Sequence, residues 1–169
     1  MPETWNLTTD KNQRIIRRER VIFDFPKLYH ALKAWAKPHQ YELVEKAFEE
    51  KVKSTGKQYV IQLEYARKFT EFVKSEISVE IVIKDMMDVM LQDNPHTLNK
   101  GNIELVITSK MIMDYKDNFQ KSPFLKALRK IYIYYITKPN MLSMAGDIAG
   151  FHESLIEVVK KHFNFYNPE

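Results

Sequence analysis

The sequence predicts an α+β fold in which a curved antiparallel sheet of about five strands packs on a long C-terminal helix. Between residues 41 and 117, apolar and polar residues alternate along most of the chain, which is typical of strands with one face in water. After residue 121, apolar residues recur instead at helical spacing. A sheet with one apolar face needs a covering layer, and the C-terminal helices are expected to supply it.

The N-terminal part predicts a strand and then a short helix. Apolar residues alternate with polar ones in "RRERVIFDF", residues 17–25, which indicates a first strand. Pro26 suits the first turn of a helix, Leu28, Leu32 and Trp35 are spaced for one side of it, and Pro38 ends it. We therefore expect a helix over residues 26–37.

The segment "YELVEKAFEEKVK", residues 41–53, fits either a strand or a helix. Its Glu, Lys and Ala residues favour a helix locally. A glycine turn at residues 53–57 leads into a long amphipathic strand, whose backbone needs a hydrogen-bonding neighbour. A strand is the favoured interpretation.

Two further runs of alternation predict the centre of the sheet. One begins at Tyr59 and continues to Ile83, too long for one strand, so a break is expected within "FVKSE", residues 72–76. The other covers residues 103–115. Between them, "QDNPHTLNKG", residues 92–101, contains turn-forming residues and predicts a hairpin loop.

Two helices are predicted to close the chain. Ser122 and Pro123 form a good cap and first turn, and apolar residues follow at helical spacing. Those side chains are expected to be packed: Phe124, Leu128, Ile131, Tyr132 and Tyr135. The last helix is expected over residues 144–165, with an apolar side that includes Ile148, Leu155 and Val159.

Composition favours a single domain over residues 1–169, with residues 1–12 and 166–169 expected to be disordered. The absence of cysteine excludes disulfides, thiolate metal sites and a cysteine nucleophile. No apolar stretch is long enough for a membrane span, and no secretion signal is recognised at the N-terminus. A cytoplasmic protein is expected.

The predicted order of elements resembles the helix-grip fold of the START-related superfamily, through "RRERVIFDF", the strands between residues 41 and 117, and the terminal helix from Met144 to Phe165. The segment "NKGNIELVITSKMIMDYKDNFQKSPFLKALRKIYIYY" is also similar to a group of uncharacterised archaeal proteins. The superfamily resemblance implies an apolar cavity between the sheet and the last helix. It carries over no functional residues, because no diagnostic motif matches.

The first functional hypothesis is therefore a non-enzymatic protein that holds a lipid or another apolar ligand between the sheet and the C-terminal helix. Ordinary core packing explains the same residues. The candidate ligand-binding residues are Tyr65, Phe69, Met111, Met113, Phe151 and Leu155.

The alternative is a basic interaction module that binds RNA, a ribosome or an acidic protein assembly. The chain carries 26 basic and 22 acidic residues, a formal charge of +4, which favours polyanions only weakly. A solvated polar face explains the same charges. The candidate polyanion-binding residues are Arg14, Arg17, Arg18, Arg20, Lys126, Arg129 and Lys130.

No catalytic residue, metal site or cofactor is predicted, and enzyme activity is left open with a binding role favoured. The five histidines lack metal-ligand spacing, and the four glycines form no phosphate-binding loop or nucleophile elbow. Asp85 and Asp88 could meet Asp114 and Asp117 if their strands are neighbours. A homo-oligomer formed through an exposed sheet edge is compatible with either function.

Overall fold

The computed structural model describes residues 3–6, 15–116 and 122–167. Its strands and helices are, in chain order, β1 (Glu3–Asn6), β2 (Ile15–Phe23), α2 (Phe25–Trp35), β3 (Glu42–Lys53), β4 (Gly56–Lys68), β5 (Val73–Val89), β6 (Leu98–Met113), α3 (Pro123–Ile131), the π-helix η2 (Tyr132–Thr137) and α4 (Lys138–Tyr166). The predicted α+β class is confirmed.

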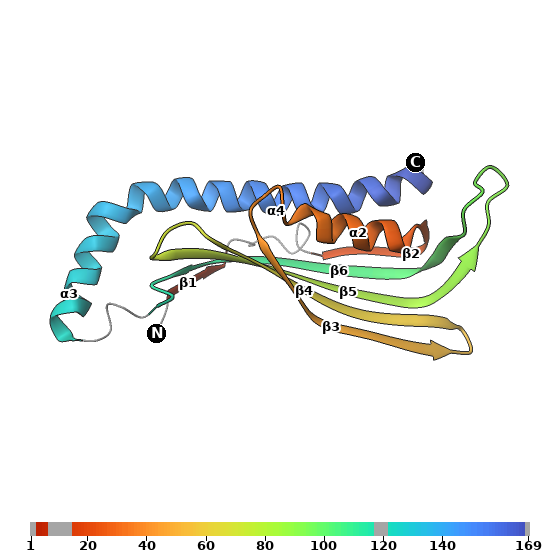
Figure 1. The fold of residues 1–169 in the computed structure, drawn as a ribbon, viewed down its shortest axis with the longest axis horizontal. Helices are drawn as coiled ribbons and strands as arrows, with labels where there is room; N and C mark the ends of the chain where they lie inside the picture. The colour runs from red at the N-terminus through yellow and green to blue at the C-terminus, as the bar shows by residue number, and fades with distance from the viewer. Residues whose placement is uncertain (1–2, 7–14, 117–121, 168–169) are drawn as a thin grey trace.

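The strands form one antiparallel sheet in the order β1-β6-β5-β4-β3, and β2 also pairs with β6. Strand β2 pairs with the first half of β6, and β1 pairs with its last residues, so both lie on the same side of β6. Helices α2 and α4 lie on one face of this long sheet (Figure 1). The predicted packing of a curved sheet on a long C-terminal helix is therefore confirmed.

Local interactions explain where the elements begin and end. The Asp24 carboxylate accepts a hydrogen bond from the Lys27 N–H at the start of α2, and the Ser122 hydroxyl does the same for Leu125 in α3. Gly56 has φ +139°, a conformation that side chains disfavour, in the β3–β4 turn. A strand at residues 42–53 is confirmed, because pairing with β4 satisfies its backbone.

The break between β4 and β5 lies slightly before the predicted segment. Strand β4 ends at Lys68 and β5 begins at Val73. The Thr70 hydroxyl accepts hydrogen bonds from the backbone N–H groups of Phe72 (3.1 Å) and Val73 (2.9 Å), which fixes the turn at residues 69–72. Strand β5 also continues past Ile83, with a register shift between Lys84 and Met87.

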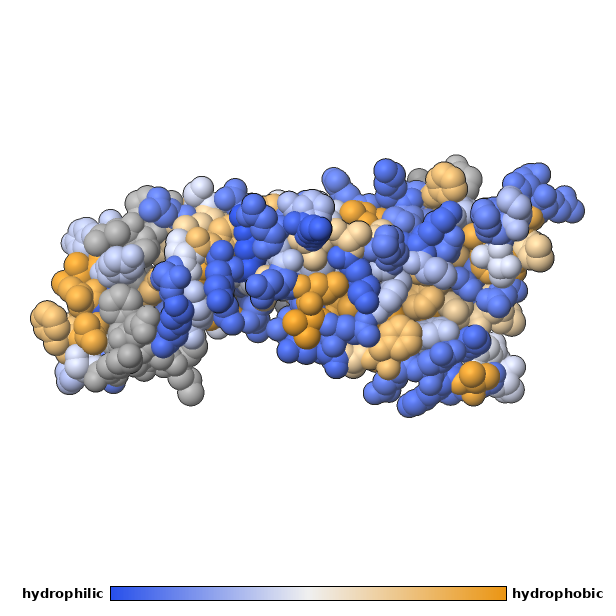
Figure 2. Space-filling model, viewed as in Figure 1, coloured by the Kyte–Doolittle hydropathy of each residue, from blue (hydrophilic) through white to orange (hydrophobic). Residues whose placement is uncertain are grey.

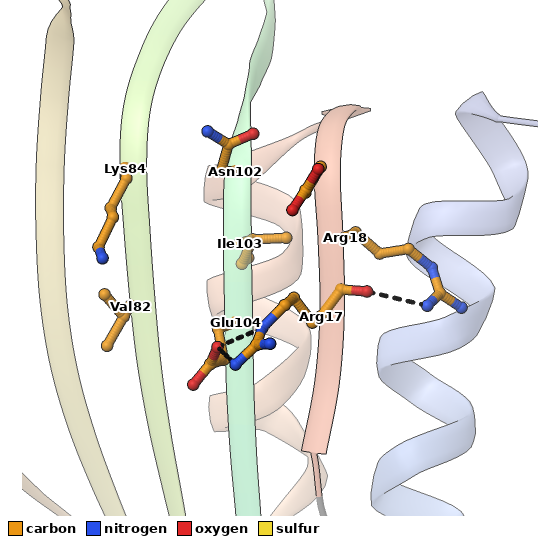
Figure 3. A pocket seen from close by; sticks show the side chains of 8 residues that line it. Arg17, Arg18, Val82, Lys84, Asn102, Ile103 and Glu104 are labelled. Atoms are coloured by element: carbon orange, nitrogen blue, oxygen red, sulfur yellow. Dashed lines mark hydrogen bonds and ion pairs between the residues drawn. The ribbon is translucent and has the colours of Figure 1, made fainter. Parts of the chain in front are cut away.

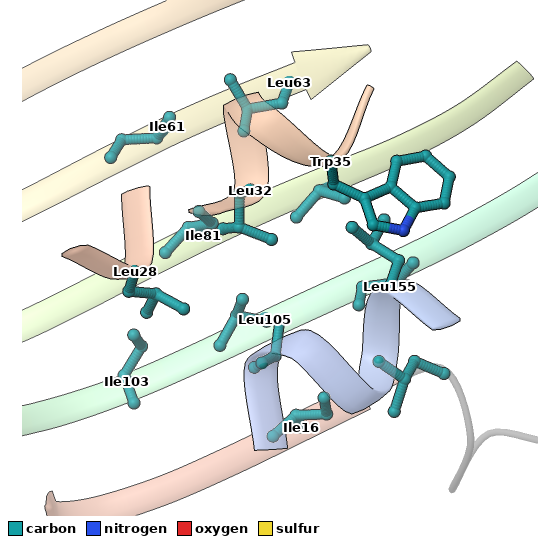
Figure 4. Packing of buried hydrophobic residues seen from close by; sticks show 14 of the residues in the cluster. Ile16, Leu28, Leu32, Trp35, Ile61, Leu63, Ile81, Ile103, Leu105 and Leu155 are labelled. Carbon is teal, nitrogen blue, oxygen red and sulfur yellow. The ribbon is translucent and has the colours of Figure 1, made fainter. Parts of the chain in front are cut away.

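The inner face of the sheet carries two apolar clusters. The main cluster joins the central strands to α2 and to the C-terminal half of α4, and Figure 4 shows Leu28, Leu32 and Leu155 pointing into it. The distal cluster lies at the other end of the sheet, against the first half of α4. Its buried members are Phe72, Val73, Met111, Met113, Met141 and Ile148.

The disorder expected at residues 1–12 and 166–169 stays a prediction, and the described residues at both ends have bonding partners. Glu3–Asn6 form β1, which pairs with Lys110–Met113. Near the other end, Asn167 accepts a hydrogen bond from the Ile22 N–H and donates one to the Ile22 carbonyl. Residues 1–2, 7–12 and 168–169 lie outside the described ranges.

The expectation that the apolar side chains of α3 are packed is wrong. Phe124 is 73% exposed, Ile131 is 55% exposed and Tyr135, in η2, is 73% exposed. Helix α3 lies beyond the end of the sheet and turns away from the line of α4 (Figure 1), so no layer formed by the described residues opposes its apolar side. Of the five side chains expected to be packed, Tyr132 contacts the distal cluster through Phe72, at 5.6 Å between ring centroids.

Candidate functional site

The six predicted ligand-binding residues line the inner face of the sheet and the facing side of α4. Tyr65 and Leu155 belong to the main cluster, and Met111 and Met113 to the distal one; all four are fully buried. Phe69 and Phe151 are half-buried, and the Arg67 guanidinium lies over both rings, at 4.6 and 5.2 Å from their centroids. Their role in ligand binding stays a prediction.

A buried polar belt separates the two clusters. Ser75, Ser109 and His152 are at most 3% exposed, and each lies in sequence between a residue of the main cluster and one of the distal cluster. Tyr41 donates a hydrogen bond to Ser75 at 3.1 Å. Within the described part of the chain, the Ser109 hydroxyl and both ring nitrogens of His152 have no hydrogen-bond partner. Burial lowers the pKa of His152 and raises those of Tyr41 and Tyr65.

An open apolar groove lies between α2 and α4, on the outside of the helical layer. Its volume is about 610 Å³, within the range typical of small-molecule sites. The groove exists because Ala31 and Ala34 of α2 are too small to fill the space opposite Val158 of α4. Trp35 also lines the groove, and its ring packs at right angles to that of Tyr65, 5.4 Å away, so one indole joins the groove to the core.

The charges that line this groove are all of one sign or neutral. Lys27, Lys161 and His162 contribute the titratable nitrogens, and its nine lining residues include no carboxylate. The His162 Nδ1–H donates to the Val158 carbonyl at 2.8 Å, which leaves Nε2 available. Lys27 also lies 3.6 Å from the Asp24 carboxylate, whereas Lys161 is exposed. An apolar floor with a cationic rim fits an amphipathic anion.

The predicted polyanion-binding residues do not form one patch. Arg17 bonds to Glu104 of β6, with 2.6 Å between Arg17 Nε and Glu104 Oε2, whereas Arg18 points to the other side of β2 (Figure 3). Arg20 lies in the β2 bulge with φ +50°, and Arg14 lies outside the described residues. A hollow of about 480 Å³ beside them contains both signs of charge, through Lys84, Glu19 and Glu104.

The remaining predicted basic residues are on α3, at the other end of the molecule. Strand β6 alone extends roughly 30 Å from Ile103, beside Arg18, to Met113 near α3. Arg129 turns inward, with its Nε 3.8 Å from the buried Asp114 carboxylate, while Lys126 and Lys130 are exposed. The two halves of the predicted basic patch are therefore far apart.

The predicted meeting of aspartates is wrong. Because β5 and β6 are antiparallel, Asp85 and Asp88 lie near the start of β6, at the opposite end from Asp114. Asp85 accepts from the Thr55 hydroxyl and Asp88 from the Asn99 amide. Asp117 lies outside the described residues, and no group of three metal-ligating side chains occurs in the part that the structure describes.

Neither the protein-family models nor the curated proteins include a match to this chain. Among the described helices, none is both long enough and apolar enough to cross a membrane. The groove was not predicted from the sequence. The sequence signal for this groove was the pair Ala31 and Ala34, which are three residues apart on the helix that carries Trp35. This spacing places two small side chains on one side of the helix, next to a large one.

Proposed function

We propose that this protein is a non-enzymatic binding protein for an amphipathic anion, an apolar chain that ends in a carboxylate or phosphate, held in the groove between α2 and α4. The observation that carries the proposal is the combination of an apolar floor with a rim of Lys27, Lys161 and His162, without a carboxylate among the nine described lining residues. The ligand class is the one expected from sequence, a lipid or other apolar molecule. The proposed site differs from the expected one, because the groove lies between α2 and α4, whereas the ligand was expected between the sheet and the C-terminal helix.

Apolar burial and charge would act on different parts of such a ligand. Its chain would lie along Ala31, Ala34 and Val158, where removing apolar surface from water contributes roughly 25 cal/mol per Å². Its head group would lie near the Lys161 ammonium, at the open side of the groove. The rim thereby favours anionic amphiphiles over neutral ones of the same length.

The fluorescence of Trp35 provides a measurement of ligand binding in the groove. The chain has two tryptophans, so a Trp5→Phe variant leaves Trp35 as the single emitting residue. A long-chain fatty acid with a brominated tail should quench the Trp35 fluorescence in a saturable manner. Ala34→Leu should weaken this binding by about tenfold or more, because the added side chain occupies space that the ligand needs. Lys161→Gln should cause a smaller loss, confined to anionic ligands.

Ala149→Leu is the matched control, since Ala149 is exposed on α4 and does not line the groove. Equal affinities for the Ala34→Leu and Ala149→Leu variants would contradict the groove. If Phe151→Ala weakened ligand binding and Ala34→Leu did not, the ligand would instead lie at the six predicted residues between the sheet and α4. Absence of saturable quenching by any amphipathic anion would contradict the function itself.

The binding of RNA, a ribosome or an acidic assembly is the second proposal, supported by Arg17, Arg18 and Lys84, which line one hollow together with Glu19 and Glu104. Charge reversal at Arg17 and Arg18 should weaken such binding and reduce its salt dependence. An unchanged salt slope would reject it. A cytoplasmic location is also proposed, supported by the absence of cysteine, which is compatible with a reducing compartment.

A homo-oligomer through a sheet edge also stays a proposal. One edge of the sheet is β3, which carries seven charged residues among its twelve and has a register shift between Glu45 and Ala47. Charges and bulges on an edge strand disfavour pairing with a second chain. Sedimentation of the protein at increasing concentration would show whether pairing occurs.

A further inference from the structure

The segment around α3 is the longest stretch of the chain without an acidic residue. Residues 118–146 contain no aspartate or glutamate and five basic residues, Lys121, Lys126, Arg129, Lys130 and Lys138. The whole chain has nearly balanced charge, 26 basic against 22 acidic residues. Residues 118–146 therefore carry positive charge that no acidic residue within the same segment offsets.

Helix α3 separates its apolar and basic side chains onto different sides. At about 100° per residue, Phe124, Leu128 and Ile131 fall within an arc of roughly 60°, here named the α3 stripe. Lys126 and Lys130 lie roughly 150° away from its centre. Arg129, which contacts Asp114, marks the side of α3 that faces the body. The α3 stripe consequently points away from the body.

This stripe is open in the described structure. Its three side chains are 73%, 40% and 55% exposed, and Tyr134 and Tyr135 of η2 add exposed rings beside it. Figure 2 shows apolar side chains gathered at this extreme end of the molecule, and Figure 1 places α3 beyond the sheet. A broad flat partner could therefore reach the stripe without contacting the rest of the protein.

We propose that α3 docks on an anionic lipid surface, with the α3 stripe inserted among the acyl chains and Lys126 and Lys130 at the level of the head groups. Interfacial helices combine an apolar side, which enters the membrane, with a basic polar side. Tyrosines are common at the membrane–water interface, where their rings are apolar and their hydroxyls remain hydrated. The docking requires no transmembrane segment.

The arrangement fits a lipid surface better than the two other candidate partners. Binding of single-stranded nucleic acid needs rings and cations along the same groove, whereas α3 places them on different sides. A symmetric pair of chains joined through α3 would bring two acid-free, positively charged segments together, and like charges repel. Anionic lipid instead complements the charge and covers the apolar side.

Vesicle sedimentation tests the proposal. The full chain should pellet with vesicles that contain phosphatidylserine and remain in solution with phosphatidylcholine alone. Leu128→Gln together with Ile131→Gln should weaken partitioning on the order of a hundredfold, because two apolar side chains no longer enter the membrane. Lys126→Gln together with Lys130→Gln should weaken it about 30-fold, since each basic side chain near an anionic surface contributes about fivefold.

Matched controls come from the β3–β4 hairpin, where Lys51→Gln with Lys53→Gln removes the same charge and Val52→Gln removes an exposed apolar side chain. These variants should partition like the unaltered chain. Equal loss in control and α3 variants would overturn the proposal, as would no pelleting with phosphatidylserine. The proposal would also be overturned if the protein formed a dimer that the Leu128 and Ile131 substitutions dissociate, or if single-stranded RNA displaced it from vesicles. Fatty-acid quenching of Trp35 is measured without vesicles and is unaffected by these outcomes.

Discussion

Helices α3 and α4 belong to one continuous helical segment, and both are amphipathic, yet their apolar sides meet different environments. In α4, Leu155 and Val159 are fully buried against the sheet. In α3, Phe124 and Ile131 are mostly exposed. The difference is the presence of a facing layer, because the sheet extends beneath α4 and ends before α3. An apolar pattern thus specifies which side of a helix can be buried. Whether that side is buried depends on a facing layer formed by another part of the structure.

The largest expected effect tests this contrast directly. Leu155→Ala should lower the free energy of unfolding by roughly 2–5 kcal/mol, since it leaves a cavity in a packed core. Leu128→Ala makes the same chemical change on α3 and should alter it by no more than about 0.5 kcal/mol. Urea denaturation followed by circular dichroism measures both. Similar losses for the two variants would mean that α3 is covered in solution, by a second copy or by the body.

A smaller effect concerns how α3 is held to the body. The Arg129 guanidinium lies near the Asp114 carboxylate, which is 1% exposed. Arg129→Ala removes this opposite charge and should destabilise the protein by roughly 1–3 kcal/mol, because a buried charge loses compensation. Amide hydrogen exchange should also accelerate in α3 while remaining slow in β4 and β5.

Lys130→Ala is the control for this change, since Lys130 is an exposed neighbour on the same helix. It should leave hydrogen exchange in α3 nearly unchanged. Equal acceleration in the two variants would show that helix propensity or net charge, rather than contact with Asp114, fixes α3.

The smallest expected effect lies at the boundary between the two clusters. His152→Leu removes two buried ring nitrogens that have no partner among the described residues, and it should stabilise the protein by about 1 kcal/mol near neutral pH. Thermal unfolding of both proteins across a pH series measures the change. A loss of stability at neutral pH would show that a bound group satisfies the ring in solution.

The pH dependence of His152 has a definite sign. Burial lowers its pKa in the folded protein below the ordinary value of 6.5, and nearby Glu153 opposes the shift more weakly. As pH falls below 6.5, the unfolded chain binds a proton at His152 more readily than the folded protein does, so stability decreases. The advantage of the His152→Leu variant should therefore grow as pH falls through this range and be smallest above it. An advantage that is constant with pH would contradict the lowered pKa.

Much of the fold could be predicted from residue patterns, because the strands and α2 obey local rules. Alternation located β4, β5 and β6, and the caps Asp24 and Ser122 begin their helices as polar N-cap residues do. The ends of elements were less predictable. The β4–β5 turn depends on the Thr70 hydroxyl, and β5 continues through a bulge that interrupts its alternation. Of the candidate site, the groove was not expected, and the ligand class stays a prediction.

The sequence by itself determined which side of each element is apolar, the order of strands and helices along the chain, and the stretch without acidic residues around α3, since these follow from residue type and spacing along the chain. Only the tertiary structure decided what faces those side chains. It left a groove where Ala31 and Ala34 oppose α4, separated Arg17 from Lys126, and left the α3 stripe exposed among the described residues. Such outcomes depend on how far the sheet extends and how closely two helices approach, which are distances between residues remote in the chain.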